Sequence, residues 1–331
     1  MKTGGTGARV GLAAAAFCLG LLAGPTPLKA QKAGATLRLG WLEVCAPGPS
    51  RAHFDLFRAR LAEQGYTEGK NLVIDQRFAD CHYERMPALA TELAQIPVDV
   101  LFTIGTRATR IVAATVKKTP VVTYSCDPFA HVERLARPGG NLTGVTCMTT
   151  ELMPKRLEIL KELVPTVARV TLLQDPEAAT NAFELTQEAA MRLGIKLQAA
   201  QVSALEDLAS ELAAIAKDRP DGLLVYPDMV LSSHPRPRQL GDFATKAKIP
   251  TVHAFRFYAD AGGLMSYGAT TTEVYASAAE QVAKIFGGVR PGELPLRRAT
   301  RFEMVINNRT AKAIGLTVPP TLLARADEVI E

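Results

Sequence analysis

The stretch VDVLFTIGTRATRIVAATVKKTPVVTYS, residues 98–125, carries the pattern that decides the fold. It opens with a short apolar run that ends at Gly105, continues through an Ala-rich segment at 108–118, and returns to a β-branched run at 120–125. Short apolar and β-branched runs are typical of strands that are covered on both faces of a parallel sheet. Residues 98–125 are therefore predicted to form a strand, a helix and the next strand of an α/β sheet.

The same alternation continues on both sides of this unit and then begins again. Ahead of it, strands are expected at 37–44 and 71–78, and helices near 50–64 and 83–95. Behind it, the segment 150–164 places its leucines on one helical face. Further strands are expected at 168–174, 195–202, 221–227 and 249–255, with helices at 180–193, 206–217, 238–247 and 272–286. Two successive series of this kind predict two α/β lobes.

Turns rich in glycine and proline are the expected places where the chain passes between the lobes. The first candidate is Pro-Gly-Gly-Asn at 138–141, and the second is Ala-Gly-Gly at 261–263. A third loop, marked by two glycines and two prolines, is expected at 287–295.

The N-terminus has the layout of a secretory signal peptide. Two basic residues precede an uncharged run at 10–23, and a small residue, Ala30, stands at a cleavage position. The uncharged run has 14 residues, which is too short to span a bilayer comfortably. A membrane anchor and lipoprotein processing at Cys18 are the alternatives. We expect removal of residues 1–30 and a periplasmic protein that begins near Gln31.

Removal of the signal peptide changes the charge and leaves an even number of cysteines. The first 30 residues contain three bases and no acids, so the remaining chain has 35 bases against 33 acids, a formal charge of +2. This nearly neutral charge does not indicate a nucleic-acid-binding protein. Four cysteines remain, and in an oxidising compartment they indicate disulfides, with free buried thiols as the alternative.

The four cysteines lie near the ends of expected strands. Cys45 ends the first strand and Cys81 follows the second. Cys126 ends the strand at 120–125, and Cys147 follows the next strand-like run, LTGVT. Because neighbouring parallel strands lie about 4.8 Å apart, cysteines at their ends can come within bridging range. The expected pairs are therefore Cys45–Cys81 and Cys126–Cys147.

The sequence contains no recognisable catalytic, cofactor or metal motif. The patterns GxSxG, HExxH and the Walker loop are missing. Ile104-Gly105-Thr106 has one glycine where a dinucleotide fingerprint needs three. The histidines do not pair with Cys or Asp at metal-ligand spacing, and Ser125-Cys126-Asp127 has no identifiable base. We therefore expect neither an enzyme nor a bound cofactor or metal.

Polar and aromatic residues gather where the expected strands end, which is the edge at which wound α/β sheets bind ligands. Amide groups at the helix start after Gly105 can hold a carboxylate, and the Thr106 hydroxyl can add a bond. Asp127 can accept bonds from a ligand ammonium. Thr106 and Asp127 can instead act only as helix caps, and Arg256 can pair with a ligand carboxylate or with Asp260. The candidate binding residues are Glu43, Cys45, Thr106, Arg107, Asp127, Asn181, Asp228, Phe255 and Tyr267.

Four segments together resemble one protein family, in the same order along the chain. They are RPGGNLTGVT (137–146), TELMPKRLEILKELVP (150–165), AGGLMSYGA (261–269) and TRFEMVINNRTAKAIGLTVPPTLLARADEVIE (300–331). The last combines a strand-like run with a helix cap at Asn307-Asn308 and a stop at Gly315. The chain resembles the substrate-binding proteins of ABC-type importers that are related to the tryptophan-binding protein.

The resemblance implies a fold and a division into domains. The fold would be α/β, with two Rossmann-like lobes and a three-segment hinge, as in type I periplasmic binding proteins. The first lobe would comprise residues 31–145 and roughly 268–300, and the second lobe residues 146–267. Residues 301–331 would pack near the hinge.

The resemblance also implies a function without catalysis. A monomer would close its lobes around a small ligand, an amino acid or another carboxylate or aromatic compound. It would then deliver that ligand to an ABC permease in the inner membrane. The alternative is a periplasmic sensor that presents its closed state to a membrane receptor. Compared with many relatives, this chain has Glu43 and Cys45 in place of small residues, and Arg107 where proline is frequent, so charge and volume differ at the expected pocket.

Overall fold

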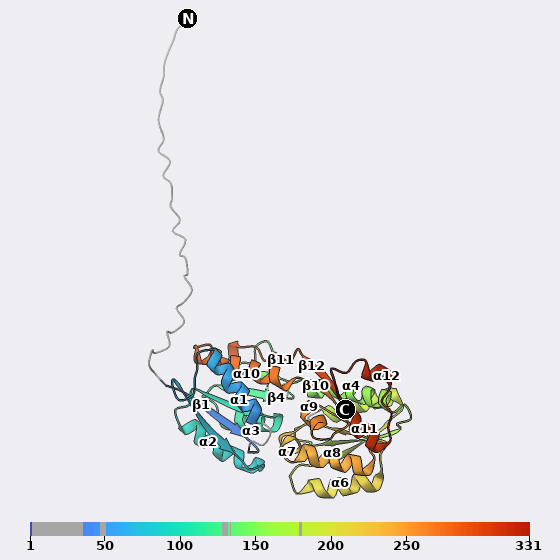
Figure 1. The fold of residues 1–331 in the computed structure, drawn as a ribbon. Helices are drawn as coiled ribbons and strands as arrows, with labels where there is room; N and C mark the ends of the chain where they lie inside the picture. The colour runs from blue at the N-terminus through green and yellow to red at the C-terminus, as the bar shows by residue number, and fades with distance from the viewer. Residues whose placement is uncertain (2–35, 47–50, 128–131, 133, 179–180) are drawn as a thin grey trace.

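The chain forms two α/β lobes that lie side by side (Figure 1). The computed structural model describes residues 36–46, 51–127, 134–178 and 181–331, together with Met1 and Val132. The expected signal peptide, its cleavage at Ala30 and Cys18 all lie outside the described residues. The two-lobed α/β prediction is confirmed. Within the described ranges, no helix is both long and apolar enough to cross a membrane.

The first lobe is built on a parallel sheet in the order β11-β5-β4-β3-β1-β2. Its strands are β1 (Leu37–Glu43), β2 (Leu72–Phe78), β3 (Val100–Ile104), β4 (Val121–Ser125), β5 (Leu142–Thr146) and β11 (Arg297–Arg298). Successive side chains of a strand point to opposite faces. In β1 and just beyond it, Leu39 and Trp41 therefore join one apolar cluster, and Leu42 and Val44 join another.

Helices cover both faces of this sheet. They are α1 (Arg51–Glu63), η1 (Tyr83–Arg85), α2 (Met86–Gln95), α3 (Thr106–Thr115), α10 (Thr271–Phe286) and η3 (Pro291–Glu293). Helices α1 and α10 pack on the face that contains Trp41, and α2 and α3 pack on the other face. Figure 1 shows α10 beside α1, although the two helices are far apart in the sequence. The apolar periodicity of 98–125 is thus explained by burial on both sides.

The second lobe contains a mixed sheet in the order β13-β12-β10-β9-β8-β6-β7. Its strands are β6 (Arg169–Gln174), β7 (Lys196–Gln201), β8 (Gly222–Val225), β9 (Thr251–His253), β10 (Met265–Ala269), β12 (Phe302–Asn307) and β13 (Glu328–Ile330). Its helices are α4 (Thr149–Leu163), α5 (Ala182–Leu193), α6 (Asp207–Asp218), α7 (Met229–Ser232), α8 (Arg236–Ala247), α9 (Arg256–Asp260), α11 (Asn308–Ile314) and α12 (Pro320–Leu323). Val170 and Leu172 of β6 pack toward α4 and α5, whereas Leu173 packs toward α6 and α8.

The chain passes between the two sheets after β5, after β10 and after β11. The prediction that it crosses at the turns 138–141, 261–263 and 287–295 is wrong, because β5, β10 and β11 follow those turns and still pair within the same lobe. The glycines instead allow the local backbone conformation and the close packing of these turns. Gly139 and Gly140 both have positive φ in the turn that enters β5, and a Cβ at Gly263 would lie 2.8 Å from the Tyr258 carbonyl oxygen.

The C-terminal segment completes the second sheet. Strand β12 pairs antiparallel with β10 and parallel with β13. The side chain of Asn307 caps α11 by accepting a bond from the Thr310 N–H at 3.0 Å. The helix ends at Gly315, whose φ of +79° is a left-handed conformation that a residue without a Cβ adopts readily. The cap and the stop at these positions are as the sequence predicts, while the proposed domain boundaries stay a prediction.

Candidate functional site

A cavity of about 290 Å³ lies between the two lobes. In the first lobe it is lined by His53, Tyr83, Ile104, Gly105, Thr106, Tyr124, Cys126, Thr271, Thr272 and Tyr275. In the second lobe it is lined by Ala178, Pro227, Asp228, Met229, Ser232, Phe255, Arg256, Phe257 and Asp260. Most of these residues follow the carboxyl ends of strands or begin helices, which is where wound α/β folds place ligands.

Three of the four aromatic rings that line the first-lobe wall contact one another. The His53 and Tyr275 rings stack in parallel with centroids 4.8 Å apart, and Tyr124 meets Tyr275 edge-on at 5.4 Å. His53 Nε2 lies 2.9 Å from the Thr271 hydroxyl. Burial lowers the pKa of His53, so its ring is neutral at pH 7. This wall therefore offers flat, uncharged surface to a bound molecule.

Helix α3 begins at the cavity. Gly105 occupies the N-cap position with φ of +99°, and its N–H donates to the Tyr124 carbonyl at 2.8 Å. The Thr106 hydroxyl lies 3.3 Å from the Ser125 hydroxyl and accepts a bond from the Asp127 N–H at 3.1 Å. Thr106 is thus the first helical residue and not the cap. The first-turn N–H groups of a helix have no partner within the helix and favour anions.

Asp228 is the polar centre of the second-lobe wall. Its Oδ1 caps α7 by accepting a bond from the Leu231 N–H at 2.8 Å. Its Oδ2 is buried and has no hydrogen-bond partner among the described residues. Burial raises the pKa of Asp228 to about 7, although the backbone N–H groups of Leu231 and Val230 and the charge of Arg107 oppose this shift. A buried acceptor without a partner is unfavourable, so this oxygen is a ready attachment point for a donor.

The remaining charged residues of the second-lobe wall are already paired. Arg256 Nε lies 3.2 Å from Asp260 Oδ2, and its Nη2 donates to Glu328 at 3.0 Å. The structure therefore supports the local pairing of Arg256 with Asp260. Phe255 and Phe257 lie beside this pair with ring centroids 5.5 Å apart. The wall thus combines apolar rings with one unsatisfied carboxylate oxygen.

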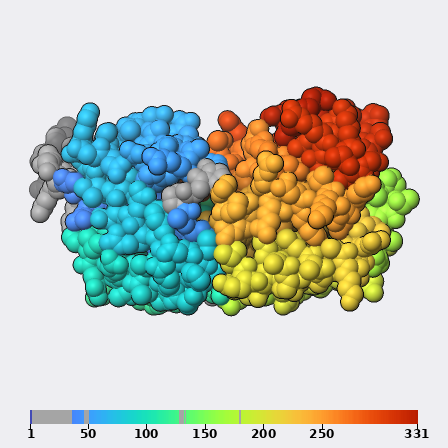
Figure 2. Space-filling view, turned by 60° about the horizontal axis from the view of Figure 1, so that its bottom comes forward, coloured from blue at the N-terminus to red at the C-terminus, as the bar shows by residue number. Residues whose placement is uncertain are grey.

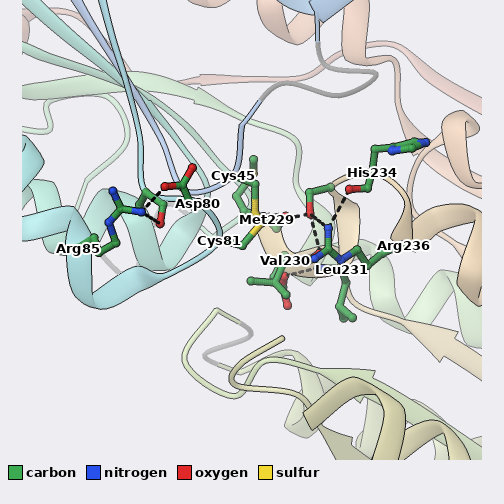
Figure 3. Close-up of a disulfide and its surroundings, with 12 residues drawn as sticks. Cys45, Asp80, Cys81, Arg85, Met229, Val230, Leu231, His234 and Arg236 are labelled. Carbon is green, nitrogen blue, oxygen red and sulfur yellow. Dashed lines mark hydrogen bonds and ion pairs between the residues drawn. A yellow bond between two sulfur atoms is a disulfide. The ribbon is translucent and has the colours of Figure 1, made fainter. Parts of the chain in front are cut away.

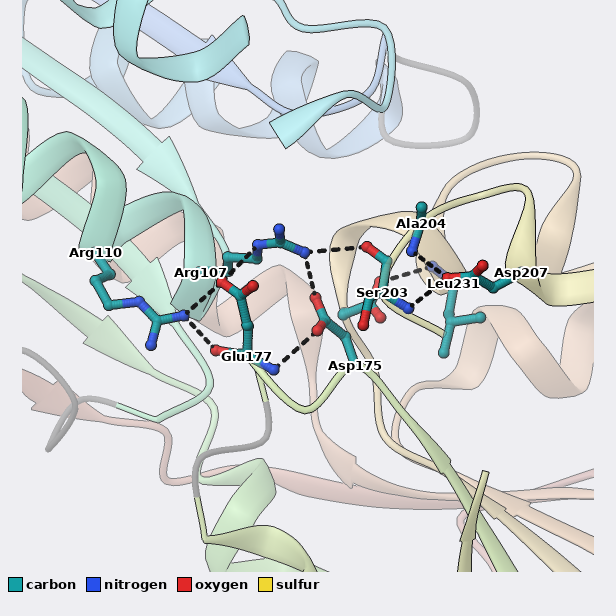
Figure 4. A network of polar contacts seen from close by, with 9 residues as sticks. Arg107, Arg110, Asp175, Glu177, Ser203, Ala204, Asp207 and Leu231 are labelled. Carbon is teal, nitrogen blue, oxygen red and sulfur yellow. Dashed lines mark hydrogen bonds and ion pairs between the residues drawn. The ribbon is translucent and has the colours of Figure 1, made fainter. Parts of the chain in front are cut away.

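An ionic contact joins the lobes next to the cavity (Figure 4). Arg107 of α3 donates through Nη1 to Asp175 Oδ2 and to the Ser203 carbonyl, each at 3.1 Å. Its Nε lies 3.1 Å from Glu177 Oε2. Arg110, one turn further along α3, donates to the Glu177 carbonyl at 2.6 Å. We call these five residues the ionic contact.

An apolar contact joins the lobes at a second place (Figure 3). The predicted disulfide between Cys45 and Cys81 is confirmed. Cys45 Sγ lies 3.6 Å from the Met229 carbonyl oxygen, and Cys81 Sγ lies 3.7 Å from Ser233 Oγ. Val230 of α7 is buried in the apolar cluster of the first lobe. We call these five residues the apolar contact, and Figure 2 shows the two lobes touching along the seam between them.

Cys126 and Cys147 lie close together without a bond between their sulfurs. Their sulfurs are 2.7 Å apart, and the structure holds both as buried thiols. Their predicted pairing therefore stays a prediction.

A comparison with known families accounts for this architecture. The model of the family described as ABC transporter substrate binding protein matches residues 48–330. The chain belongs to this family. A tyrosine-binding protein of Clostridioides difficile is 22% identical over 266 residues, which cover 78% of this chain and 75% of that protein.

Solved structures of other proteins share the fold of this substrate-binding protein. A conserved domain protein from Vibrio cholerae O1 biovar eltor gives a TM-score of 0.83 at 27% identity, covering 89% of this chain and 99% of its own. The ABC domain from Streptococcus pneumonia, solved in complex with L-Trp, gives a TM-score of 0.80 at 21% identity, covering 89% of this chain and 100% of its own.

The cavity of this substrate-binding protein contains three of the candidate binding residues, Thr106, Asp228 and Phe255. The other candidates lie outside its lining. Arg107 bridges the lobes, and Cys45 is in the disulfide. Glu43 is buried at the end of β1 and accepts a bond from Trp41 Nε1–H, while Asp127 supports Thr106, Asn181 precedes α5 and Tyr267 lies on β10.

Sequence reasoning missed the aromatic side chains that come from helices. His53 lies on α1 and Tyr275 on α10, and neither follows a strand directly. Tyr83 begins a short helix after β2, and Met229 opens α7. The signal that could have found them is the start of a helix that follows a strand, because all four residues lie within the first five positions of such a helix.

Proposed function

We propose that this substrate-binding protein is exported and binds a small organic cation with an apolar or aromatic body between its lobes. An amino acid with a large side chain fits this description. The observation that carries the proposal is the buried Asp228 Oδ2, which lacks a partner among the described residues and lines the cavity. A ligand ammonium would supply the missing donor as a charge-assisted bond.

The rest of the lining supports the same class of ligand. The start of α3, at Gly105 and Thr106, offers first-turn N–H groups suited to a ligand carboxylate. The rings of His53, Tyr275 and Phe255 line the space between these two polar ends. The related tyrosine-binding protein and the structure with bound L-Trp are consistent with an aromatic amino acid.

Binding would act through closure of the lobes. Thr106 belongs to the first lobe and Asp228 to the second, so a ligand that contacts both favours the closed arrangement. The ionic and apolar contacts form only where the lobes meet, and they add to the stability of that arrangement. A monomer that closes in this way would present one surface to an ABC permease.

Export of the protein rests on two observations. The uncharged run at 10–23 follows basic residues, as in signal peptides. The Cys45–Cys81 disulfide belongs to an oxidising compartment. N-terminal sequencing of protein recovered from the periplasm should begin near Gln31. Recovery of the full-length chain from the cytoplasm alone would contradict export.

The decisive experiment identifies the ligand and tests Asp228. Small molecules released on denaturation are analysed by mass spectrometry, and calorimetry then compares L-tryptophan with indole-3-propionate, which lacks the ammonium. Asp228→Asn is expected to weaken binding of the released amine by about 10- to 100-fold, since a charged hydrogen bond contributes about 1.5–3 kcal/mol. Asp260→Asn is the matched control, because Asp260 lines the same cavity but is already paired with Arg256. A released ligand without a cationic nitrogen would overturn the proposal.

Delivery to a permease requires a separate test. Cells that lack this protein should lose uptake of the identified ligand, and the wild-type gene should restore it. Normal uptake together with a lost cellular response to the ligand would support the sensing role instead.

A further inference from the structure

We propose that Cys126 and Cys147 form a second disulfide, which closes at the wall of the ligand cavity and ties the first crossing between the lobes to strand β4. The pair lies outside the proposed binding chemistry, and the inference does not depend on which ligand binds. The two cysteines directly follow the neighbouring strands β4 and β5.

The backbone places these two cysteines opposite each other. Ser125 of β4 pairs in register with Thr146 of β5, so the next residues on the two strands are Cys126 and Cys147. Neighbouring strands lie about 4.8 Å apart, which is within the Cα separation of disulfides. The two sulfurs lie 2.7 Å apart and face each other. A bond between them therefore needs only a small side-chain rotation.

The surroundings of the pair favour reaction of Cys147. Burial opposes its ionisation, yet bonds with Cys126 and with the Thr149 hydroxyl, 3.2 Å away, together with the charge of Arg156, lower the pKa of Cys147. Arg156 is completely buried, and the charges that act on it come from cysteine and tyrosine side chains and not from a carboxylate of the described ranges. Its Nη2 also lacks a hydrogen-bond partner there. The buried guanidinium thus supplies positive charge beside a thiol that can become a thiolate.

The two sulfurs differ in their exposure to the cavity, and this difference sets the order in which they react. Cys126 lines the cavity, whereas Cys147 is fully buried. A small disulfide that enters the cavity exchanges first with Cys126, which loses its proton, forms a mixed disulfide and releases one thiol of the oxidant. The hydrogen bond with Cys147 and burial raise the pKa of Cys126, which slows this first step. The Cys147 thiolate then attacks the Cys126 sulfur and expels the second thiol. The two protons lost by the cysteines are carried by the two thiols released, and the oxidant gains two electrons.

The disulfide would anchor the first chain segment that crosses between the lobes. Cys147 is the first residue after β5, Met148 has a φ of +55°, and Thr149 begins α4 in the second lobe. A bond to Cys126 fixes residue 147 to the first lobe, so bending at this crossing is restricted to Met148 and Thr149. The first crossing then moves less than it does in the reduced protein.

Peptide mapping tests the bond in the full chain. Protein is equilibrated with glutathione disulfide, alkylated without reduction and digested with trypsin. The expected product joins peptide 119–134, which contains Cys126, to peptide 135–155, which contains Cys147. The internal control is the joined pair 39–51 and 78–85, which contains Cys45 and Cys81. Alkylation of Cys126 and Cys147 while the control pair stays joined would overturn the proposal, as would any other pairing of these two cysteines.

Two variants extend this test to the hinge. Cys126→Ser should leave Cys147 open to alkylation after unfolding and keep the control pair joined. In native-state hydrogen exchange, amides at 147–149 should exchange at least several-fold more slowly in the oxidised protein than in the Cys126→Ser/Cys147→Ser double variant. Equal exchange rates in the two proteins would show that the crossing is not anchored by the bond.

Discussion

The ionic contact and the apolar contact hold the same two lobes together by different physical means. The ionic contact places Arg107, whose side chain is 16% exposed, against Asp175, whose side chain is 1% exposed. The apolar contact places α7 of the second lobe against a disulfide of the first lobe. Charged pairs near the surface respond to salt, whereas apolar burial scales with the area removed from water.

The two contacts also differ in how they reach the cavity. The apolar contact continues directly from Asp228, which caps α7 and lines the cavity. A donor that satisfies Asp228 therefore acts on the position of α7. Arg107 follows Thr106 in α3 without lining the cavity itself, and its charge, together with that of Asp175, acts on Asp228. Both contacts are therefore linked to Asp228, the apolar contact through the cap of α7 and the ionic contact through its charges.

The largest effect is expected from removal of the Cys45–Cys81 disulfide. The bond closes a loop with a sequence separation of 36. The double variant Cys45→Ser/Cys81→Ser should lose about 2–4 kcal/mol of unfolding free energy, because the unfolded chain regains the entropy that the bond removed. Urea unfolding under non-reducing conditions measures this loss. An unchanged midpoint and slope would mean that the apolar contact does not need the disulfide.

The next largest effect is expected from Arg107→Ala. The change removes the cation that faces the buried carboxylate of Asp175. Closure should weaken by about 1.5–3 kcal/mol, which is the range for hydrogen bonds to charged groups. Small-angle scattering of ligand-free protein should report a larger radius of gyration. A radius equal to that of wild type at low salt would show that the apolar contact alone keeps the lobes closed.

A smaller effect is expected from pH, and it should act through the apolar contact. Asp228 has a pKa of about 7 in the closed protein, while a solvated aspartate has a pKa of about 3.9. Closure of the lobes is therefore accompanied by uptake of a proton at any pH between these two pKa values. Without ligand, the closed population should fall as pH rises from about 4 to about 7, by at most about tenfold per unit, and then stay constant.

Scattering across this pH range measures the change, and Asp228→Asn is the control. The asparagine keeps an oxygen that can cap α7 but removes the titration. Dependence on pH that persists in this variant would assign the effect to another group, such as Glu43, whose pKa burial raises to about 8.

The smallest effect is expected from Arg110→Ala. Arg110 is 42% exposed and its partner Glu177 is 56% exposed, and exposed ion pairs contribute less than about 1 kcal/mol. The variant should leave both the scattering radius and its salt dependence close to wild type. It thereby serves as the matched control for Arg107→Ala. An effect as large as that of Arg107→Ala would mean that the ionic contact acts as one unit.

Much of the fold could be predicted from the sequence because the burial of one or both faces of an element fixes the local spacing of its apolar residues. The strand expected at 98–105 is β3, the strand expected at 120–125 is β4, and the helix expected at 150–164 is α4. In each case the spacing of apolar residues follows from which faces are covered. The crossing points were predicted less well, since a glycine-rich turn looks the same whether the next strand stays in the lobe or leaves it.

The candidate site was predictable only where it follows a strand. Thr106, Asp228 and Phe255 lie just beyond β3, β8 and β9, and sequence reasoning placed all three at the cavity edge. His53 and Tyr275 come from helices α1 and α10, which are far apart in the sequence. The contact of His53 with Thr271, for example, joins residues with a sequence separation of 218. The start of a helix after a strand marks each residue by itself, but no local pattern shows that the two residues meet.

The sequence by itself determined the longer strands and helices and the cap of α11 at Asn307, because these depend on neighbours a few residues away. The tertiary structure alone decided that Arg107 faces Asp175, that α7 rests on the disulfide, and that Asp228 Oδ2 is left without a partner in the described residues. Those features depend on how two lobes fit together. Residues that meet across the cleft are far apart in the chain, and only packing brings them within hydrogen-bond range.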